Sequence, residues 1–169
     1  MIQDVENKLE IKNKLFLFYK NNKLKIISLI ILIFLILSAL ILIKENHKKK
    51  NILQAENYIK AGIYLSNGKE NQAVEIFEEI IMSKNKFYSI LALNTILEKN
   101  LVEKEEKILG YFKTLESINF SEDTTDIINF KKALFFLKKS NLEQGNKLLQ
   151  KLIDKNSNQK NIAQEIIDK

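Results

Sequence analysis

The strongest hydrophobic pattern in the chain is an unbroken apolar run from Ile26 to Ile43. Its eighteen residues carry no charge, and two serines are the only polar side chains among them. A helix rises about 1.5 Å per residue, so the run would extend roughly 27 Å, close to the hydrocarbon thickness of a bilayer. Lys25 and Lys44 bracket it and can extend their ammonium groups to the lipid headgroups. The pattern predicts a transmembrane helix over residues 26–43.

Two other structures could produce such a run. A core helix would need apolar neighbours on every side, and the rest of the chain is too small to supply them. A cleaved signal peptide has an apolar region of about 7–15 residues followed by a small-residue cleavage site. Here the run is longer and passes directly into KENHKKK, a basic juxtamembrane flank at residues 44–50. We therefore expect an uncleaved, single-pass anchor in contact with membrane lipid.

Past Lys50 the apolar residues recur at spacings of three and four, a period typical of amphipathic helices. Residues 51–169 contain no alternating run of β-branched residues that would predict a strand. Polar breaks divide this part into about seven helices. The breaks fall at residues 66–71, 83–86, 98–100, 119–126, 139–141 and 155–160. The chain is therefore predicted to be all-α, with a transmembrane helix followed by a helical domain.

Two segments of this domain, residues 61–81 and 133–153, share a pattern at a constant offset of 72 residues. Both follow the order small, aromatic, small, large, large. A tetratricopeptide unit needs this order, because a small residue lets two helices approach closely and large residues fill the gap. The pattern predicts a tetratricopeptide-like helical-repeat (α-solenoid) domain, with an irregular helical bundle as the alternative. The matching pairs are Ala61 and Ala133, Tyr64 and Phe136, Ala73 and Gly145, Phe77 and Leu149, and Ile80 and Leu152.

The segment between these two follows the pattern only in part. Ala92, Ile108 and Tyr111 occupy the corresponding positions, but Lys104 stands where a small residue is expected. This middle unit is therefore predicted to be degenerate, and the final residues, 161–169, are predicted to cap the last helix pair.

Charge is concentrated around the apolar run. Residues 1–25, a short basic N-terminal tail, carry six lysines against three acidic residues, and residues 44–50 carry four against one. Residues 51–169 are neutral, with 17 charges of each sign. This distribution suits lipid headgroups, and every basic residue is Lys rather than the Arg favoured for nucleic-acid recognition, so we expect no nucleic-acid partner. Lysines near the two ends of the run are nearly balanced, so the positive-inside rule assigns no orientation. The tail is either a helix lying in the membrane interface or a disordered segment with an aromatic anchor.

The sequence offers little catalytic chemistry. It contains no cysteine, which excludes disulfides, thiolate metal sites and a thiol nucleophile. His47, the single histidine, has no second ligand at metal spacing. Glu78–Glu79 and Glu105–Glu106 are adjacent and point to different helix faces, which indicates solvated charge rather than an acid/base couple. We expect a non-enzymatic protein without cofactor, metal or small-molecule substrate.

Helical repeats bind partners through the concave face formed by the first helix of each pair. Aromatic and aliphatic side chains on that face suit an extended or helical segment of a protein. The alternative for each residue is that it belongs to the core between neighbouring helices. The predicted partner-binding residues are Tyr58, Leu65, Ser89, Leu93, Ile96, Phe130, Leu134 and Leu137.

Three stretches carry a family resemblance. They are FYKNNKLK (18–25), the first repeat (54–80) and SKNKFYSILALNTILEKNLVEKEEKIL (83–109). With the anchor between them, they resemble the YfgM-type ancillary subunit of the bacterial SecYEG translocon, whose tetratricopeptide-like domain is shared with a cell-division coordinator. The resemblance covers residues 18–169.

This resemblance implies a cytoplasmic N-terminus, one span of the bacterial inner (cytoplasmic) membrane and a periplasmic repeat domain. It also implies two protein partners, the SecYEG channel and a membrane-anchored periplasmic chaperone of the prolyl-isomerase type. The protein would then assist secreted chains as they leave the channel. Two alternatives stay open: an envelope-assembly or cell-division adaptor with the same topology, and a cytoplasm-facing adaptor tethered to the membrane.

Overall fold

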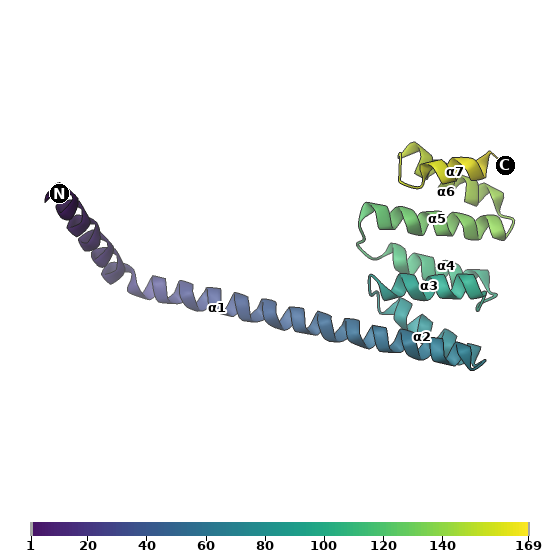
Figure 1. Cartoon of the computed structure of the whole chain (residues 1–169), viewed down its shortest axis with the longest axis horizontal. Helices are drawn as coiled ribbons and strands as arrows, with labels where there is room; N and C mark the ends of the chain where they lie inside the picture. The colour runs from purple at the N-terminus through teal and green to yellow at the C-terminus, as the bar shows by residue number, and fades with distance from the viewer. Residues whose placement is uncertain (1, 169) are drawn as a thin grey trace. The chain divides into compact units, whose positions relative to one another are not determined.

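The computed structural model describes residues 2–168, with the side chains of residues 11–14, 16–29 and 31–168. Met1 and Lys169, at the ends of the predicted segments, lie outside the described residues. Helices make up 83% of the chain, and the described residues contain no strand, which confirms the all-α prediction. The helices are α1 (Ile2–Ser66), α2 (Glu70–Met82), α3 (Tyr88–Lys99), α4 (Glu105–Glu116), α5 (Glu122–Lys138), α6 (Leu142–Asp154) and α7 (Lys160–Ile167) (Figure 1).

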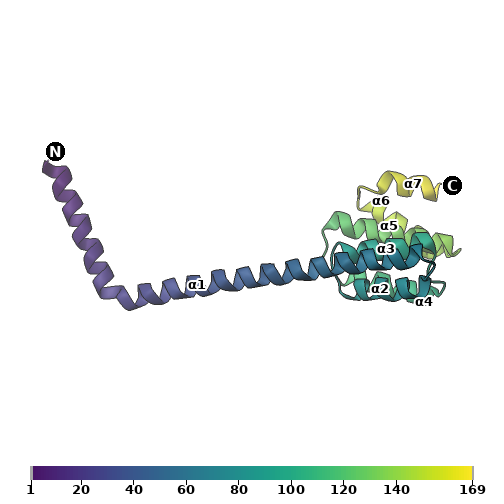
Figure 2. The same ribbon diagram turned by 60° about the horizontal axis from the view of Figure 1, so that its bottom comes forward.

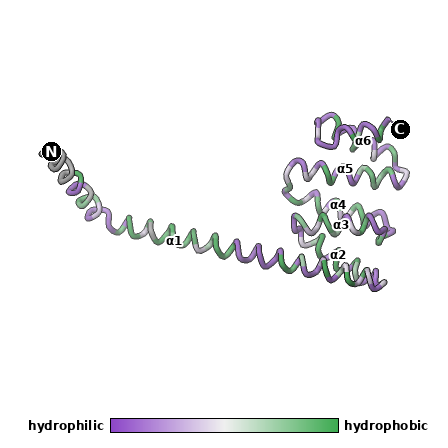
Figure 3. Tube along the Cα trace, viewed as in Figure 1, coloured by the Kyte–Doolittle hydropathy of each residue, from purple (hydrophilic) through white to green (hydrophobic). Residues whose placement is uncertain are grey.

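Helix α1 continues beyond the apolar run on both sides. It includes the basic tail from Ile2, the lysine-rich flank and the first helix of the predicted repeat domain. Figure 3 shows the hydrophobic stretch in the middle of this helix. By length and composition this stretch could cross a membrane, and none of it is buried within the protein, unlike a core helix. The backbone of the tail is helical from Ile2, and a position of this helix in the membrane interface stays a prediction.

The chain divides into two compact units, Met1–Lys50 and Asn51–Lys169. The second unit contains the end of α1 and the helices α2–α7, which run back and forth (Figures 1 and 2). Its turns therefore gather at two ends. The end where α1 begins the unit, called the entry end, holds the α2–α3, α4–α5 and α6–α7 turns. The opposite end, called the far end, holds the other three turns.

Local capping explains where the structure departs from the predicted helix boundaries. The predicted link at residues 119–126 is too long, because α5 already begins at Glu122. Ser121 caps this helix by accepting a hydrogen bond from the Thr124 N–H, and the acidic first turn complements the helix dipole. Helix α3 likewise runs through Lys99 and ends at Asn100, whose left-handed φ of 51° is one that Asn tolerates.

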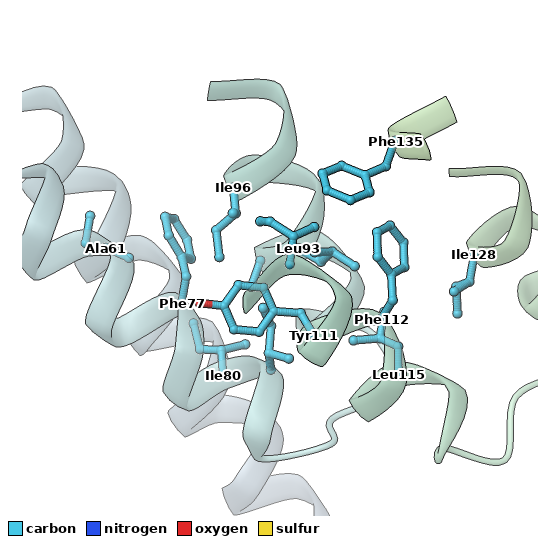
Figure 4. Packing of buried hydrophobic residues seen from close by; sticks show 14 residues of the cluster. Ala61, Phe77, Ile80, Leu93, Ile96, Tyr111, Phe112, Leu115, Ile128 and Phe135 are labelled. Carbon is cyan, nitrogen blue, oxygen red and sulfur yellow. The ribbon is translucent and has the colours of Figure 1, made fainter. Parts of the chain in front are cut away.

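The larger hydrophobic cluster joins helices α1 to α5 (Figure 4). Ala61 on α1 and Ala73 on α2 are fully buried, and their small size lets these helices approach closely. The gap is filled by large side chains, each of which contributes about 1.5–3 kcal/mol when buried. These are Phe77, Ile80, Ile81, Leu93, Ile96, Ile108, Tyr111, Phe112, Leu115, Ile128 and Phe135.

A smaller cluster of Ala133, Leu149 and Ala163 joins α5, α6 and α7. Ala133 and Gly145 are buried here at the positions that correspond to Ala61 and Ala73 in the first pair. All ten residues matched between the two segments are buried except Tyr64, which is half-buried. The two helix pairs thus bury the same pattern, although the tetratricopeptide assignment itself stays a prediction.

Two glycines should respond differently to alanine. A Cβ at Gly145 would lie 2.5 Å from Leu137 Cδ2 and 3.2 Å from the Ala133 carbonyl oxygen, whereas a Cβ at Gly110 would meet nothing within 4 Å. Gly110→Ala should therefore raise the free energy of unfolding by about 0.5–1 kcal/mol. We expect Gly145→Ala to be about 1–3 kcal/mol less stable than Gly110→Ala, because of overpacking. Urea unfolding of a 51–169 fragment measures both, and equal effects would contradict the close approach of α5 and α6.

Candidate functional site

A groove of about 500 Å³ lies where the C-terminal part of α3, the α3–α4 connection and α5 meet. Half of its lining residues are apolar: Ile96, Leu97, Val102, Ile108, Leu134 and Phe135. Glu98 and Glu103 line it from the α3 side, and Lys131, Lys138 and Lys139 line it from α5. The groove thus combines an apolar surface with charges of opposite sign on its two walls.

The late start of α4 explains why the groove lies here. Residues 101–104 connect the two helices without regular secondary structure, and Lys104 is the exposed N-cap of α4 rather than a small residue inside the helix. Helix α4 therefore begins too late to fill the space beside the end of α3. Across this gap, the Lys138 ammonium group of α5 donates a hydrogen bond to the Asn100 side chain. In the sequence, the feature that corresponds to the groove is Lys104, which stands where the repeat pattern has a small residue.

Three of the predicted partner-binding residues are buried, so the prediction that they form a binding surface is wrong. Ser89, Leu93 and Ile96 are at most 1% exposed. Ser89 Oγ donates to the Ile80 carbonyl oxygen at 2.9 Å, which ties the start of α3 to the end of α2. Ile96 lies against the groove but belongs to the core.

Four other predicted residues are half-buried and pack mainly within the protein. The ring of Tyr58 lies 5.6 Å from that of Phe77, and its hydroxyl is 2.9 Å from Thr95 Oγ1. Leu65 packs against the larger cluster, whereas Phe130 and Leu137 pack against the smaller one.

Leu134 is 39% exposed and lines the groove. Of the eight predicted residues, the structure brings only Leu134 and Ile96 to the groove. Sequence reasoning missed the groove lysines of α5, because periodicity does not tell which neighbour covers each face of a helix.

The sequence predicted that Glu78 is a solvated charge, but in the structure it has two partners within the protein. Its carboxylate accepts a hydrogen bond from the Tyr111 hydroxyl and forms an ion pair with Lys107, which joins α2 to α4. Burial raises the pKa of Tyr111 well above its ordinary value, and the hydrogen bond and charge of Glu78 act in the same direction. Neither Glu78 nor Tyr111 lines the groove, so this network links helices.

A second charged network joins α5 to the end of α6. Asp126 is only 3% exposed, and its Oδ1 lies 2.8 Å from Lys155 Nζ, which also lies 3.0 Å from Glu122 Oε1. The hydrogen bonds from Lys155 to Asp126 and Glu122 raise the pKa of Lys155. A buried carboxylate without a partner would be costly, so Lys155 holds these two helices together.

The Tyr111 network predicts a pH dependence of stability. Because the pKa of Tyr111 is raised in the folded state, the unfolded chain loses this proton first, and stability falls as the pH rises above about 10. We expect a smaller fall for Tyr111→Phe, which should also be about 1 kcal/mol less stable at neutral pH for loss of the hydrogen bond. Urea unfolding of the 51–169 fragment at neutral and alkaline pH measures this, with Tyr64→Phe as the matched control. An alkaline fall as steep in Tyr111→Phe as in the parent would rule out this role.

Comparison of the chain with protein-family models, with curated proteins and with solved structures gives no match. The resemblance to the ancillary translocon subunit therefore rests on the sequence features described above.

Proposed function

We propose that this chain is a non-enzymatic, membrane-anchored scaffold that binds a segment of a partner protein in the groove between α3 and α5. The groove is the observation that carries the proposal, because it places an exposed leucine and five charged side chains around one apolar hollow. Sites of this kind use apolar contacts for affinity and a few polar groups for orientation. The unburied apolar stretch of α1 supports the anchor.

The two walls of the groove favour a particular partner chemistry. Lys131, Lys138 and Lys139 would attract acidic side chains, and Glu98 and Glu103 would attract basic ones. The volume of about 500 Å³ suits a few apolar side chains rather than a large folded surface. An amphipathic segment that is acidic along one edge and basic along the other fits this arrangement best.

The tetratricopeptide-like solenoid is also part of the proposal. Small buried residues at Ala61, Ala73, Ala133 and Gly145 support it, because both helix pairs pack closely at the same positions. The sequence resemblance then favours the SecYEG channel or a membrane-anchored periplasmic chaperone as the partner. On this proposal the N-terminus is cytoplasmic and the repeat domain is periplasmic.

Topology tests the first part of this proposal. The chain has no native cysteine, so single cysteines at exposed Ser83 and Lys12 would be the only thiols. We expect a membrane-impermeant maleimide to label intact cells at position 83 and not at position 12, with both labelled after permeabilisation. Labelling at position 12 alone would place the domain in the cytoplasm, which would support the cytoplasm-facing adaptor and exclude the translocon role.

Photo-crosslinking tests the groove. A photoreactive side chain at Lys139 should give adducts with SecYEG or the anchored chaperone, whereas one at exposed Lys113, outside the groove, should not. Leu134→Glu should reduce the adduct about tenfold, which corresponds to about 1.4 kcal/mol of binding free energy. Thermal unfolding checks that this variant stays folded. Adducts from Lys113 alone, or adducts that survive Leu134→Glu, would count against the groove, and adducts with other envelope proteins would favour the envelope-assembly adaptor.

A further inference from the structure

The turn between α2 and α3 lies next to the start of the second unit. Asn85 Nδ2 donates to Asn51 Oδ1 at 2.5 Å, which fixes this turn beside α1. Asn51 follows the lysine-rich flank directly and stands eight residues after Ile43, the last residue of the apolar run. Eight helical residues extend about 12 Å, and the headgroup layer on each side of a bilayer is roughly 5–8 Å thick. Only eight residues separate Asn51 from the end of a span over residues 26–43, so the turn bonded to Asn51 is within reach of the headgroups.

The turn exposes the residue types that favour a membrane surface. Phe87 is 62% exposed, and Lys84 and Lys86 beside it are exposed as well. A Phe side chain can bury its apolar ring at the boundary between headgroups and acyl chains, and lysines are attracted to anionic lipids. The lysines of residues 44–50 precede Asn51 directly in the chain and extend the same basic character.

The turn is also held in one conformation. Asn85 Oδ1 accepts hydrogen bonds from the Phe87 and Tyr88 N–H groups, both at 3.0 Å, and Lys84 adopts a left-handed φ of 55°. The ring of Phe87 meets that of Tyr88 edge-on, with 5.1 Å between their centroids. Tyr88 in turn lies 6.2 Å from Tyr58, inside the helix pair. Contacts with the core therefore hold the exposed Phe87 ring in place. The ring then loses little conformational entropy when it enters the apolar part of a membrane surface.

The other turns at the entry end differ in character. At the start of α5, Glu122 pairs with Lys155 and Asp123 accepts a hydrogen bond from Asn158. These acidic residues have partners within the protein and would not attract an anionic surface. Among the described turns at this end, the combination of an exposed aromatic ring and two exposed lysines belongs to the α2–α3 turn.

We propose that the α2–α3 turn binds the membrane surface, with Phe87 entering the headgroup region and Lys84 and Lys86 contacting anionic phospholipid. This inference rests on the proposed membrane anchor. It adds a second lipid contact to that anchor, made by the folded domain itself.

Lipid-dependent quenching tests this contact in the full-length chain. Ser83→Cys, carrying an environment-sensitive dye, reports on the turn, and Ser140→Cys in the α5–α6 turn at the far end is the matched control. In vesicles containing phosphatidylglycerol, a headgroup-attached nitroxide should quench the dye at position 83 at least about twofold more than the dye at position 140. Three separate changes should each reduce the quenching at position 83 by a similar factor. The first is the use of phosphatidylcholine vesicles. The second is the double variant Lys84→Gln with Lys86→Gln, and the third is Phe87→Ser.

Equal quenching at the two positions would overturn the contact. So would quenching at position 83 that is unchanged by lipid charge and by the substitutions, since that would reflect tethering alone. Alkaline extraction of the same vesicles separates the anchor from the turn. A chain that stays in the vesicles without selective quenching retains its anchor and lacks the contact, whereas a chain that is extracted lacks the anchor on which the contact rests.

Discussion

The helices of the second unit depend on one another for their existence. Helices α2, α3, α4 and α6 have 12 or 13 residues and α7 has eight, lengths at which an isolated helix is marginal in water. They persist because each buries an apolar face against its neighbours, and that burial requires close approach. Ala61, Ala73 and Gly145 permit this approach, and the large side chains opposite them supply most of the stabilisation.

Much of this arrangement could be predicted from the sequence. Apolar spacing indicated the helices, because a face that is buried on one side leaves a period near 3.6 residues in the sequence. The offset of 72 residues identified corresponding buried positions in two helix pairs. The start of α5 was harder to predict. The acidic and threonine residues after Ser121 are typical of a link between helices, but they are also favourable in the first turn of a capped helix.

The contacts between distant residues were not predictable from periodicity. Glu78 finds its partners Lys107 and Tyr111 on α4, about thirty positions away in the chain. Ser89, Leu93 and Ile96 were assigned to a binding face because they share one face of α3, yet neighbouring helices cover that face completely. The groove lies where the sequence departs from the repeat pattern, at Lys104. A search for matches to that pattern does not select such a position.

The sequential order of the helix contacts has a consequence for biosynthesis. Helix α3 packs mainly on α2, α6 on α5, and α7 on α6, so each newly synthesised helix meets a surface that already exists. Contacts between neighbours in sequence allow rapid, stepwise folding. Because α1 comes first, the residues that would insert into the lipid leave the ribosome before any helix that packs on Tyr58 or Ala61. If residues 26–43 span a membrane, the unit would assemble from its tethered end outward, and its incomplete forms would be confined to the membrane surface rather than released into solution.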